Sequence, residues 1–163
     1  FMIPVLFADS QKLPSKNPCI CVESQEKLGG INPESLNPVS ILVVDDSVEC
    51  RMILRIAIER EGYRCVEAAD GIAALKLFQE KTIDFIITDF HMPHMNGCEF
   101  LEVLSSAAIS CPPAVMITGN LADSVRMRAT RAGALAVLSK PFDQKNILKM
   151  VREVVHRNQE VLH

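Results

Sequence analysis

The sequence predicts an α/β fold in which a parallel five-stranded sheet is covered by helices on both faces. Short apolar runs of strand length alternate with stretches of helical period five times between residues 40 and 157. This alternation is typical of parallel sheets, because the crossover between two parallel strands usually contains a helix. Right-handed crossovers then place the ends of the first, third, fourth and fifth strands near one another.

The first two strands of this pattern cover residues 41–44 and 63–68. Ser47 follows the first strand and is a favourable N-cap residue, so we expect a helix from there towards Gly62. The apolar residues of this helix stand at helical spacing: Met52, Ile53, Ile56 and Ala57. A second helix follows the Asp70-Gly71 pair and carries Ile72, Leu75 and Phe78.

The other three strands cover residues 83–88, 114–117 and 134–138. The helices that follow them are expected over residues 98–108, 121–132 and 143–157. A loop with Pro93 and the Asn96-Gly97 pair precedes the first of these helices. The last helix is expected to bury its regularly spaced apolar residues, which are Ile147, Leu148, Val151, Val154 and Val155.

The first 39 residues lack any sustained period and are rich in proline. Proline fixes φ and has no amide donor, so residues 1–39 are expected to form an N-terminal arm or linker, such as the remnant of an upstream region. The regular pattern over residues 40–157 predicts a single domain. Residues 158–163 are expected to form a C-terminal tail.

Composition argues against several classes of function. The formal net charge of −3 provides no basic field for direct binding of nucleic acid. No apolar stretch approaches the roughly 18 residues of a membrane helix, so no membrane segment is expected. The six cysteines are scattered except for Cys19-Ile-Cys21, which lacks the second ligand pair of a structural zinc site. A reduced, cytoplasmic protein is therefore expected.

Polar side chains directly follow four of the predicted strands: Asp45, Asp46, Asp89, Thr118 and Lys140. Ligands of open α/β sheets bind at the carboxyl ends of the strands, so we expect these side chains to meet there. Three crowded carboxylates oppose one another's ionisation unless a cation is present, and Mg²⁺ prefers such oxygen ligands. A carboxylate beside Mg²⁺ is a competent nucleophile towards phosphorus, and Lys140 and Thr118 can bind phosphoryl oxygens.

Simpler explanations exist for individual residues. Asp45 or Ser47 alone can merely cap a helix, although the five polar residues together favour a site. The segment 91–95 contains two histidines and two methionines, as a soft-metal clip would, but Pro93 disfavours that geometry. His94 is instead expected to face solvent and the methionines to fill gaps. Three arginines are expected to form a solvated helix face or part of a partner surface: Arg126, Arg128 and Arg131.

The residues around these positions resemble the receiver domain of two-component response regulators, chemotaxis regulators included. The matching motifs are Val-Val-Asp-Asp-Ser ending at Ser47, Thr-Asp-Phe-His-Met-Pro-His-Met-Asn-Gly ending at Gly97, Ile-Thr-Gly ending at Gly119, and Ser-Lys-Pro-Phe ending at Phe142. The resemblance implies a flavodoxin-like fold with strand order 2-1-3-4-5. It also implies transfer of a phosphoryl group from a phosphohistidine to an aspartate of this chain.

By the same resemblance, Asp89 is the phosphoacceptor. Asp46 and Asp89 are expected to ligate Mg²⁺ directly, with the backbone carbonyl of His91 as a third ligand and Asp45 acting through water. Lys140 is expected to pair with the phosphoryl group and to precede a cis peptide bond to Pro141.

Thr118 is expected to move towards the phosphoryl group. Gly119 beside it leaves room for the backbone to approach that group, and Gly97 fits a turn that needs a positive φ. Two positions, His91 and Asn120, are expected to tune the lifetime of the phosphate. Val137 departs from the family, because an aromatic switch residue is usual three residues before the lysine.

The expected partners are a histidine kinase or a histidine phosphotransfer protein, and an output partner at the face around residues 121–132 and 134–138. A homodimer is left open. The chain is expected to be a stand-alone regulator or the terminal receiver of a larger protein such as a hybrid kinase, and not an enzyme beyond self-phosphotransfer and autodephosphorylation. Two alternatives are a degenerate receiver that acts as a binding scaffold and a Mg²⁺-dependent phosphohydrolase that forms an aspartyl phosphate. The second lacks the expected second aspartate, since Val48 stands two residues after Asp46.

Overall fold

A computed structural model describes residues 38–107 and 111–160. Most of the N-terminal arm predicted over residues 1–39 lies outside the described residues, as does the end of the predicted C-terminal tail. The last helix continues to Glu160, three residues into the segment expected to be that tail.

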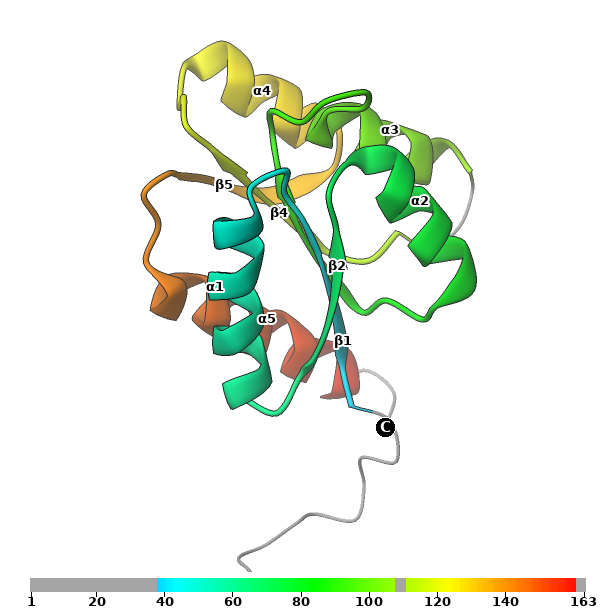
Figure 1. Ribbon diagram of the computed structural model, residues 1–163, viewed down its shortest axis with the longest axis vertical. Helices are drawn as coiled ribbons and strands as arrows, with labels where there is room; N and C mark the ends of the chain where they lie inside the picture. Colours follow the sequence, from blue (N-terminus) through cyan, green and yellow to red (C-terminus); the bar gives the residue numbers. More distant parts are fainter. Residues whose placement is uncertain (1–37, 108–110, 161–163) are drawn as a thin grey trace, which may run out of the picture. The chain divides into compact units, whose positions relative to one another are not determined.

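Five strands alternate with five helices along the described chain, as predicted (Figure 1). The strands are β1 (Ser40–Val44), β2 (Arg64–Ala68), β3 (Phe85–Asp89), β4 (Ala114–Thr118) and β5 (Ala134–Ser139). The helices are α1 (Val48–Arg60), α2 (Gly71–Glu80), α3 (Gly97–Ser106), α4 (Asp123–Arg131) and α5 (Gln144–Glu160).

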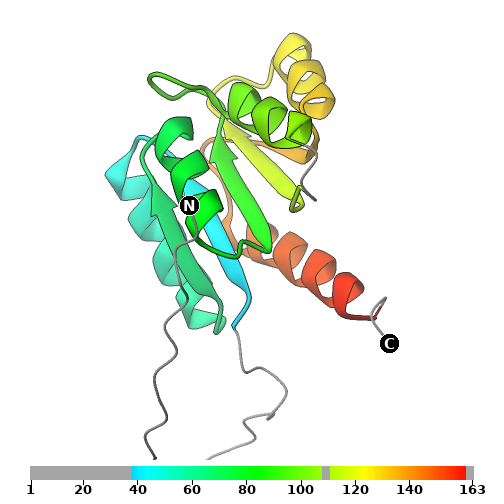
Figure 2. The ribbon, with the colours of Figure 1, turned by 90° about the vertical axis from the view of Figure 1, so that its right-hand side faces the viewer.

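The strands form one parallel sheet in the order β2-β1-β3-β4-β5, which confirms the flavodoxin-like fold (Figure 2). β1 and β3 are hydrogen-bonded neighbours at the centre, so the residues that follow them emerge side by side. Between β4 and β5 the register places Thr118 opposite Ser139, one residue before Lys140. The topology therefore brings the predicted polar residues to one edge of the sheet.

Helices cover both faces of the sheet (Figure 1), and a hydrophobic layer lies beneath them on each face. Strand residues that alternate along β1 divide between the layers, with Ile41 and Val43 on one face and Leu42 and Val44 on the other. The layer that contains Ile41 and Val43 packs against α1 and α5. The layer that contains Leu42 and Val44 packs against α2, α3 and α4. As predicted, α5 buries Ile147, Leu148, Val151 and Val155, whereas Val154 is partly buried.

The sequence pattern does not show which face of α1 is buried. Of the four apolar residues expected on this helix, only Ala57 is buried, and Met52, Ile53 and Ile56 are between 40% and 45% exposed. Leu54, Ala57 and Ile58 face the sheet in their place. Both sets have helical spacing, so periodicity alone does not distinguish them, and packing against the sheet selects one.

Side-chain caps begin the first three helices. Ser47, Asp70 and Asn96 each accept a hydrogen bond from a backbone N–H in the first turn of α1, α2 and α3. α4 differs, because its N-cap residue Ala122 provides no side-chain hydrogen bond. Helices in the described part of the chain are also too short or too polar to cross a membrane.

Candidate functional site

Three carboxylates gather at the carboxyl end of β1 and β3. Ligand oxygens of Asp45, Asp46 and Asp89 lie within 4.8 Å of one another. Asp45 and Asp89 are 2% and 6% exposed, whereas Asp46 is exposed to solvent. Two buried carboxylates and one exposed carboxylate thus open onto the same point at the sheet edge.

Asp45 is held from two sides. Its Oδ1 atom accepts a hydrogen bond from the backbone N–H of Ser47 at 2.8 Å, and its Oδ2 atom accepts one from Nζ of Lys140 at 2.8 Å. In addition, the guanidinium group of Arg51 donates to the backbone carbonyl of Asp45 at 2.6 Å. Sequence inspection missed Arg51, whose only signal is its position one turn into the helix that follows the aspartates.

Lys140 contacts both buried carboxylates. Its Nζ atom lies 2.8 Å from Oδ2 of Asp45 and 3.2 Å from Oδ1 of Asp89. Burial disfavours the charged ammonium, but the hydrogen bond to Asp45 and the negative charge of Asp89 outweigh this effect and raise the pKa of Lys140. Lys140 is therefore a permanent cation at this site.

Lys140 is positioned by the end of β5. Its backbone N–H donates to the carbonyl oxygen of Thr118 at 2.7 Å, which fixes the residue beside the end of β4. The peptide bond between Lys140 and Pro141 is cis. The chain turns at this point and then enters α5.

The environment of Asp89 opposes its ionisation. Burial raises the pKa of this carboxyl, and the charge of Asp45 acts in the same direction. The positive charge of Lys140 lowers the pKa of Asp89 but does not fully compensate. With three carboxylates and one ammonium, the site has an excess of negative charge that an additional cation can neutralise.

Thr118 lies at the same edge but is turned towards the following loop. It is buried, and its hydroxyl group donates to the carbonyl oxygen of Asn120 and accepts from the backbone N–H of Asn120, both at 3.1 Å. The side chain of Asn120 in turn accepts a hydrogen bond from the backbone N–H of Ala122 at 3.0 Å. These bonds connect Thr118 to the beginning of α4.

The two glycines near the site have different surroundings. A Cβ atom at Gly97 would collide with the carbonyl oxygen of Asp89, so this position needs glycine because the backbones approach closely. The predicted need for a positive φ at Gly97 is wrong, because in this loop His94 is the residue with a positive φ, at 65°. A Cβ atom at Gly119 would meet nothing within 4 Å, so the space beside this residue is open.

The loop between β3 and α3 does not form a soft-metal clip. His94 is solvent-facing, as expected, and its Nδ1 atom lies 3.5 Å from Oδ2 of Asp70. Met92 and Met95 pack against the hydrophobic layer beneath α2 and α3. His91 is exposed, and its ring meets the ring of Phe90 edge to face at 4.6 Å.

The position of the missing aromatic switch is partly buried. Val137 lies on β5 opposite Met116 of β4 and packs against the layer that contains Phe90. A β-branched side chain is restricted at χ1, so Val137 offers little rotational freedom.

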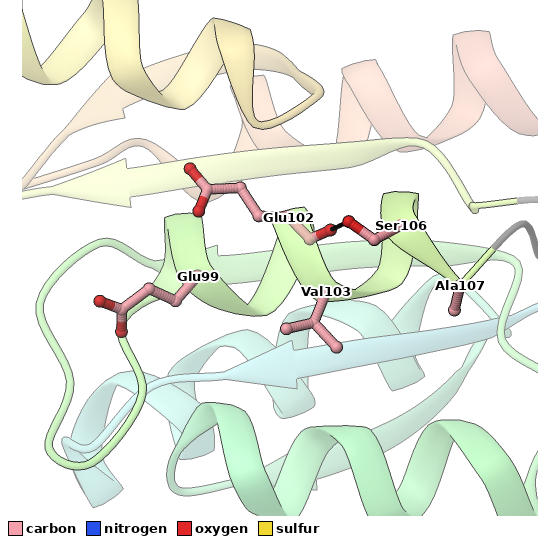
Figure 3. Close-up of a pocket in the computed structure, with 5 residues that line it drawn as sticks. All are labelled: Glu99, Glu102, Val103, Ser106 and Ala107. Atoms are coloured by element: carbon pink, nitrogen blue, oxygen red, sulfur yellow. Dashed lines mark hydrogen bonds between the residues drawn. The ribbon is translucent and has the colours of Figure 1, made fainter.

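A surface depression along α3 is unrelated to the acidic cluster. It has a volume of about 430 Å³ and is lined by Glu99, Glu102, Val103, Ser106 and Ala107 (Figure 3). The hydroxyl group of Ser106 already donates to the carbonyl oxygen of Glu102 at 2.8 Å. Glu99 is also engaged, since it accepts a hydrogen bond from the backbone N–H of Asn96. These groups offer no nucleophile or metal site.

The acidic cluster is suited to Mg²⁺. Carboxylate oxygens at this spacing are hard ligands, and the exposed Asp46 leaves access for water and a phosphate group, both of which Mg²⁺ retains as ligands. The buried Asp89 lies beside Asp45 and Asp46, and its Oδ1 atom is 3.2 Å from Nζ of Lys140, a cation that can neutralise charge on a phosphoryl group. The arrangement therefore fits phosphoryl transfer to a carboxylate.

Comparisons with known proteins find a matching family model and several relatives. The family model of the response regulator receiver domain matches residues 41–152. The chain is 30% identical over 118 residues to the phosphate regulon transcriptional regulatory protein PhoB of Klebsiella pneumoniae, an alignment that covers 72% of this chain and 52% of PhoB. It is 31% identical to the transcriptional regulatory protein CpxR of Escherichia coli, with coverage of 72% and 50%. The chain thus spans about half the length of these relatives.

Solved structures show the same fold. Chemotaxis protein CheY4 of Vibrio cholerae superposes with a TM-score of 0.67 at 31% identity, over 72% of this chain and 99% of CheY4. A CheY-like receiver domain of Methanospirillum hungatei superposes with a TM-score of 0.71 at 24% identity, over 76% of this chain and 98% of that domain.

Proposed function

Because the chain belongs to the response regulator receiver family, we propose that it accepts a phosphoryl group on Asp89 in the presence of Mg²⁺ and changes its binding to a partner in response. The family is a signalling domain and not a classical enzyme. The observation that carries the proposal is the position of Asp89, which is buried, clusters with Asp45 and Asp46, and lies within 3.2 Å of the ammonium group of Lys140.

The proposed reaction forms a bond between a carboxylate oxygen of Asp89 and phosphorus while the P–N bond of a donor phosphohistidine breaks. The departing imidazole nitrogen keeps the electron pair and takes a proton. Mg²⁺, bound by Asp46, Asp89 and the carbonyl oxygen of His91 with Asp45 acting through water, would neutralise charge on the phosphoryl oxygens.

Two side chains of this chain would bind the phosphoryl group after transfer. Lys140 would exchange its contact with Asp89 for a phosphoryl oxygen, at no cost in protonation because the pKa of Lys140 is already raised. The hydroxyl group of Thr118 would exchange its bonds to Asn120 for another phosphoryl oxygen. Since Asn120 also bonds the start of α4, this exchange would loosen that helix. The open space beside Gly119 leaves room for the movement.

The exposed face of α1 supports a helical phosphoryl donor, such as a histidine kinase or a histidine phosphotransfer protein. Four apolar side chains on this helix are between 40% and 62% exposed: Val48, Met52, Ile53 and Ile56. α1 begins directly after the acidic pair, so a helix packed on this face would lie close to Asp89.

An output partner is proposed at the face of α4 and β5. Met127 on α4 and Leu135 on β5 are 55% and 62% exposed, and large exposed apolar residues are frequent in interfaces. The same face is also the proposed surface for a homodimer.

A reducing, cytoplasmic location is proposed as well, since the four described cysteines are all free.

The second candidate function is a binding scaffold that is not phosphorylated. One observation favours it, namely that Val137 occupies the position of the usual aromatic switch. The complete set of carboxylates, hydroxyl and ammonium favours the phosphorylated function instead.

Incubation with acetyl phosphate and Mg²⁺, followed by intact-mass measurement, separates the two functions. The wild-type protein is expected to gain the mass of one phosphoryl group, because transfer breaks the P–O bond of acetyl phosphate and releases acetate. Asp89→Asn should gain nothing. Asp84→Asn is the matched control, since Asp84 directly precedes β3 and lies at its opposite end. An unlabelled wild-type protein would leave the scaffold as the function.

A further inference from the structure

α4 buries few of its own residues against the rest of the domain. Ala129 is the only fully buried residue within this helix, and Ala122 provides no side-chain cap. By comparison, α3 buries five residues and has a complete capping box formed by Asn96 and Glu99. The position of α4 therefore depends strongly on the few side chains that connect it to its neighbours.

Arg128 makes two of these connections. Its guanidinium carbon lies over the ring of Phe90, 6.0 Å from the ring centroid, and its NH2 atom lies 3.8 Å from Oε1 of Glu99. Figure 3 shows Glu99 at the beginning of α3, with its side chain projecting from the helix. Neither contact is strong alone, but both come from the same side chain.

The two partners of Arg128 flank the loop that follows the phosphoacceptor. Phe90 is 8% exposed and directly follows Asp89, so its ring is fixed to the end of β3. Glu99 accepts a hydrogen bond from the backbone N–H of Asn96 at 3.0 Å, which fixes the last residue of the loop. Arg128, itself half exposed, thus contacts the first residue of the segment 90–96 directly and its last residue through Glu99.

The described side chains also indicate why this connection matters. The space at Val137 is occupied by a side chain with little rotational freedom, so a rotating aromatic ring cannot carry the signal through β5. Phe90 belongs to the same hydrophobic layer as Val137 and is itself linked to α4. A displacement at the end of β3 therefore has a direct path to α4 that does not involve β5.

We propose that Arg128 is a positioning residue that couples the phosphoacceptor end of β3 to α4 through its contacts with Phe90 and Glu99. The inference rests on the proposed phosphorylation of Asp89 and assigns the step that follows it. By thermodynamic linkage, a partner that binds α4 would in turn change the stability of the phosphorylated state.

Hydrogen–deuterium exchange of residues 123–131 tests the coupling in the whole chain. Exchange is measured with Mg²⁺ alone and with Mg²⁺ and beryllofluoride, a stable mimic of the phosphoryl group. In the wild-type protein we expect the mimic to change the exchange rate of α4 by about fivefold, the low end of typical coupling factors, because both contacts are weak. In Arg128→Ala the change should fall to about twofold, the part that Asn120 still carries to the start of α4, while labelling by acetyl phosphate continues at the wild-type rate.

Two further variants distinguish coupling from general loosening of α4. Arg126→Ala is the matched control, because Arg126 is exposed on the same helix and takes part in none of the ion pairs found among the described residues. It should respond to the mimic as the wild type does. Arg128→Lys keeps a cation above the ring and should restore part of the response.

The outcomes separate the inference from the proposed function. If the wild-type protein is not labelled by acetyl phosphate, the proposed function fails and the inference fails with it. If the wild-type protein is labelled and Arg128→Ala transmits the full response to α4, the inference alone is overturned. An equal loss of response in Arg126→Ala and Arg128→Ala would also overturn it.

Discussion

The Nζ atom of Lys140 lies 2.8 Å from Oδ2 of Asp45, although 95 residues separate the two in the chain. This contact joins the end of β5 to the end of β1, and it brings the ammonium group within 3.2 Å of Oδ1 of Asp89. Lys140 therefore holds the carboxylates of Asp45 and Asp89 together. It also offers positive charge at Asp89, the proposed phosphoacceptor.

Variants of Lys140 test whether its positive charge speeds the labelling of Asp89. Lys140→Ala is expected to slow labelling of Asp89 by acetyl phosphate more than tenfold, because the positive charge that neutralises the phosphoryl oxygens is lost. Lys140→Arg should restore only part of the rate, since the planar guanidinium group does not fit the geometry of an ammonium point charge. The time course of intact mass measures both. Lys145→Ala, at an exposed position on α5, should label at the wild-type rate. A wild-type rate in Lys140→Ala would contradict the role of Lys140.

Gly97 is expected to tolerate no side chain. In Gly97→Ala the added Cβ atom meets the backbone carbonyl of Asp89, which can move only if β3 or α3 shifts. The free energy of unfolding should therefore fall by about 1–3 kcal/mol, as in other overpacked sites. Urea denaturation measures the loss. The matched variant is Gly119→Ala, whose Cβ atom meets nothing within 4 Å, and its unfolding free energy should stay within about 0.5 kcal/mol of the wild type. Equal stability of the two variants would show that the close approach at Gly97 is wrong.

The orientation of α1 can be tested by two isoleucines of the same helix. Ile58 is fully buried, and Ile58→Ala should lower the free energy of unfolding by about 2–5 kcal/mol. Ile56 is 41% exposed, and Ile56→Ala should change it by about 0.5 kcal/mol or less. The reverse ranking in urea denaturation would contradict this orientation of α1. If the exposed face binds a phosphoryl donor, Ile53→Ser should slow transfer from a phosphohistidine protein but not from acetyl phosphate.

Cys65 should make the protein less stable at alkaline pH. Burial raises the pKa of this thiol from 9.0 to about 12, with the charges of Glu67 and Glu59 acting in the same direction and Arg55 opposing them. Because the folded-state pKa is the higher one, the folded protein binds the proton more tightly. The thiol's contribution to stability is complete below pH 9 and is lost as the pH rises towards 12. Tyr63 has its pKa raised by burial and by Glu61, so it acts in the same direction at higher pH.

Urea denaturation at pH 8 and pH 10.5 measures this effect. The loss of stability between the two values should be smaller in Cys65→Ala than in the wild type, because the alanine variant retains Tyr63 but lacks the thiol. A pH dependence unchanged by Cys65→Ala would contradict the burial of this thiol.

Most of the fold could be predicted from the sequence, because each strand is a short apolar run and each of the first three helices begins at a good cap. Ser47 is an example in which the residue type alone predicts the local bond that the structure contains. Strand ends differed by up to two residues, as at β3, which begins at Phe85 and not at residue 83. Such limits depend on hydrogen bonds to neighbouring strands, which local sequence does not determine.

The composition of the candidate site was also predictable, since Asp45, Asp46, Asp89, Thr118 and Lys140 each stand at the end of a strand. The contacts that these side chains make could not be predicted from the sequence. That Thr118 bonds Asn120, and that Arg128 alone among three arginines of α4 reaches Phe90 and Glu99, depends on how loops and helices pack. Nothing in the spacing of the three arginines distinguishes Arg128 from the others.

By itself the sequence determined the order of the elements, the fold class and the identity of the polar residues at the sheet edge, because strand length, helical period and capping act over a few neighbouring residues. Only the tertiary structure decided which stripe of α1 is buried, why Gly97 must be glycine, and which cation connects α4 to the end of β3. These three features depend on atoms that are distant in sequence, and only close packing against the sheet brings them into contact.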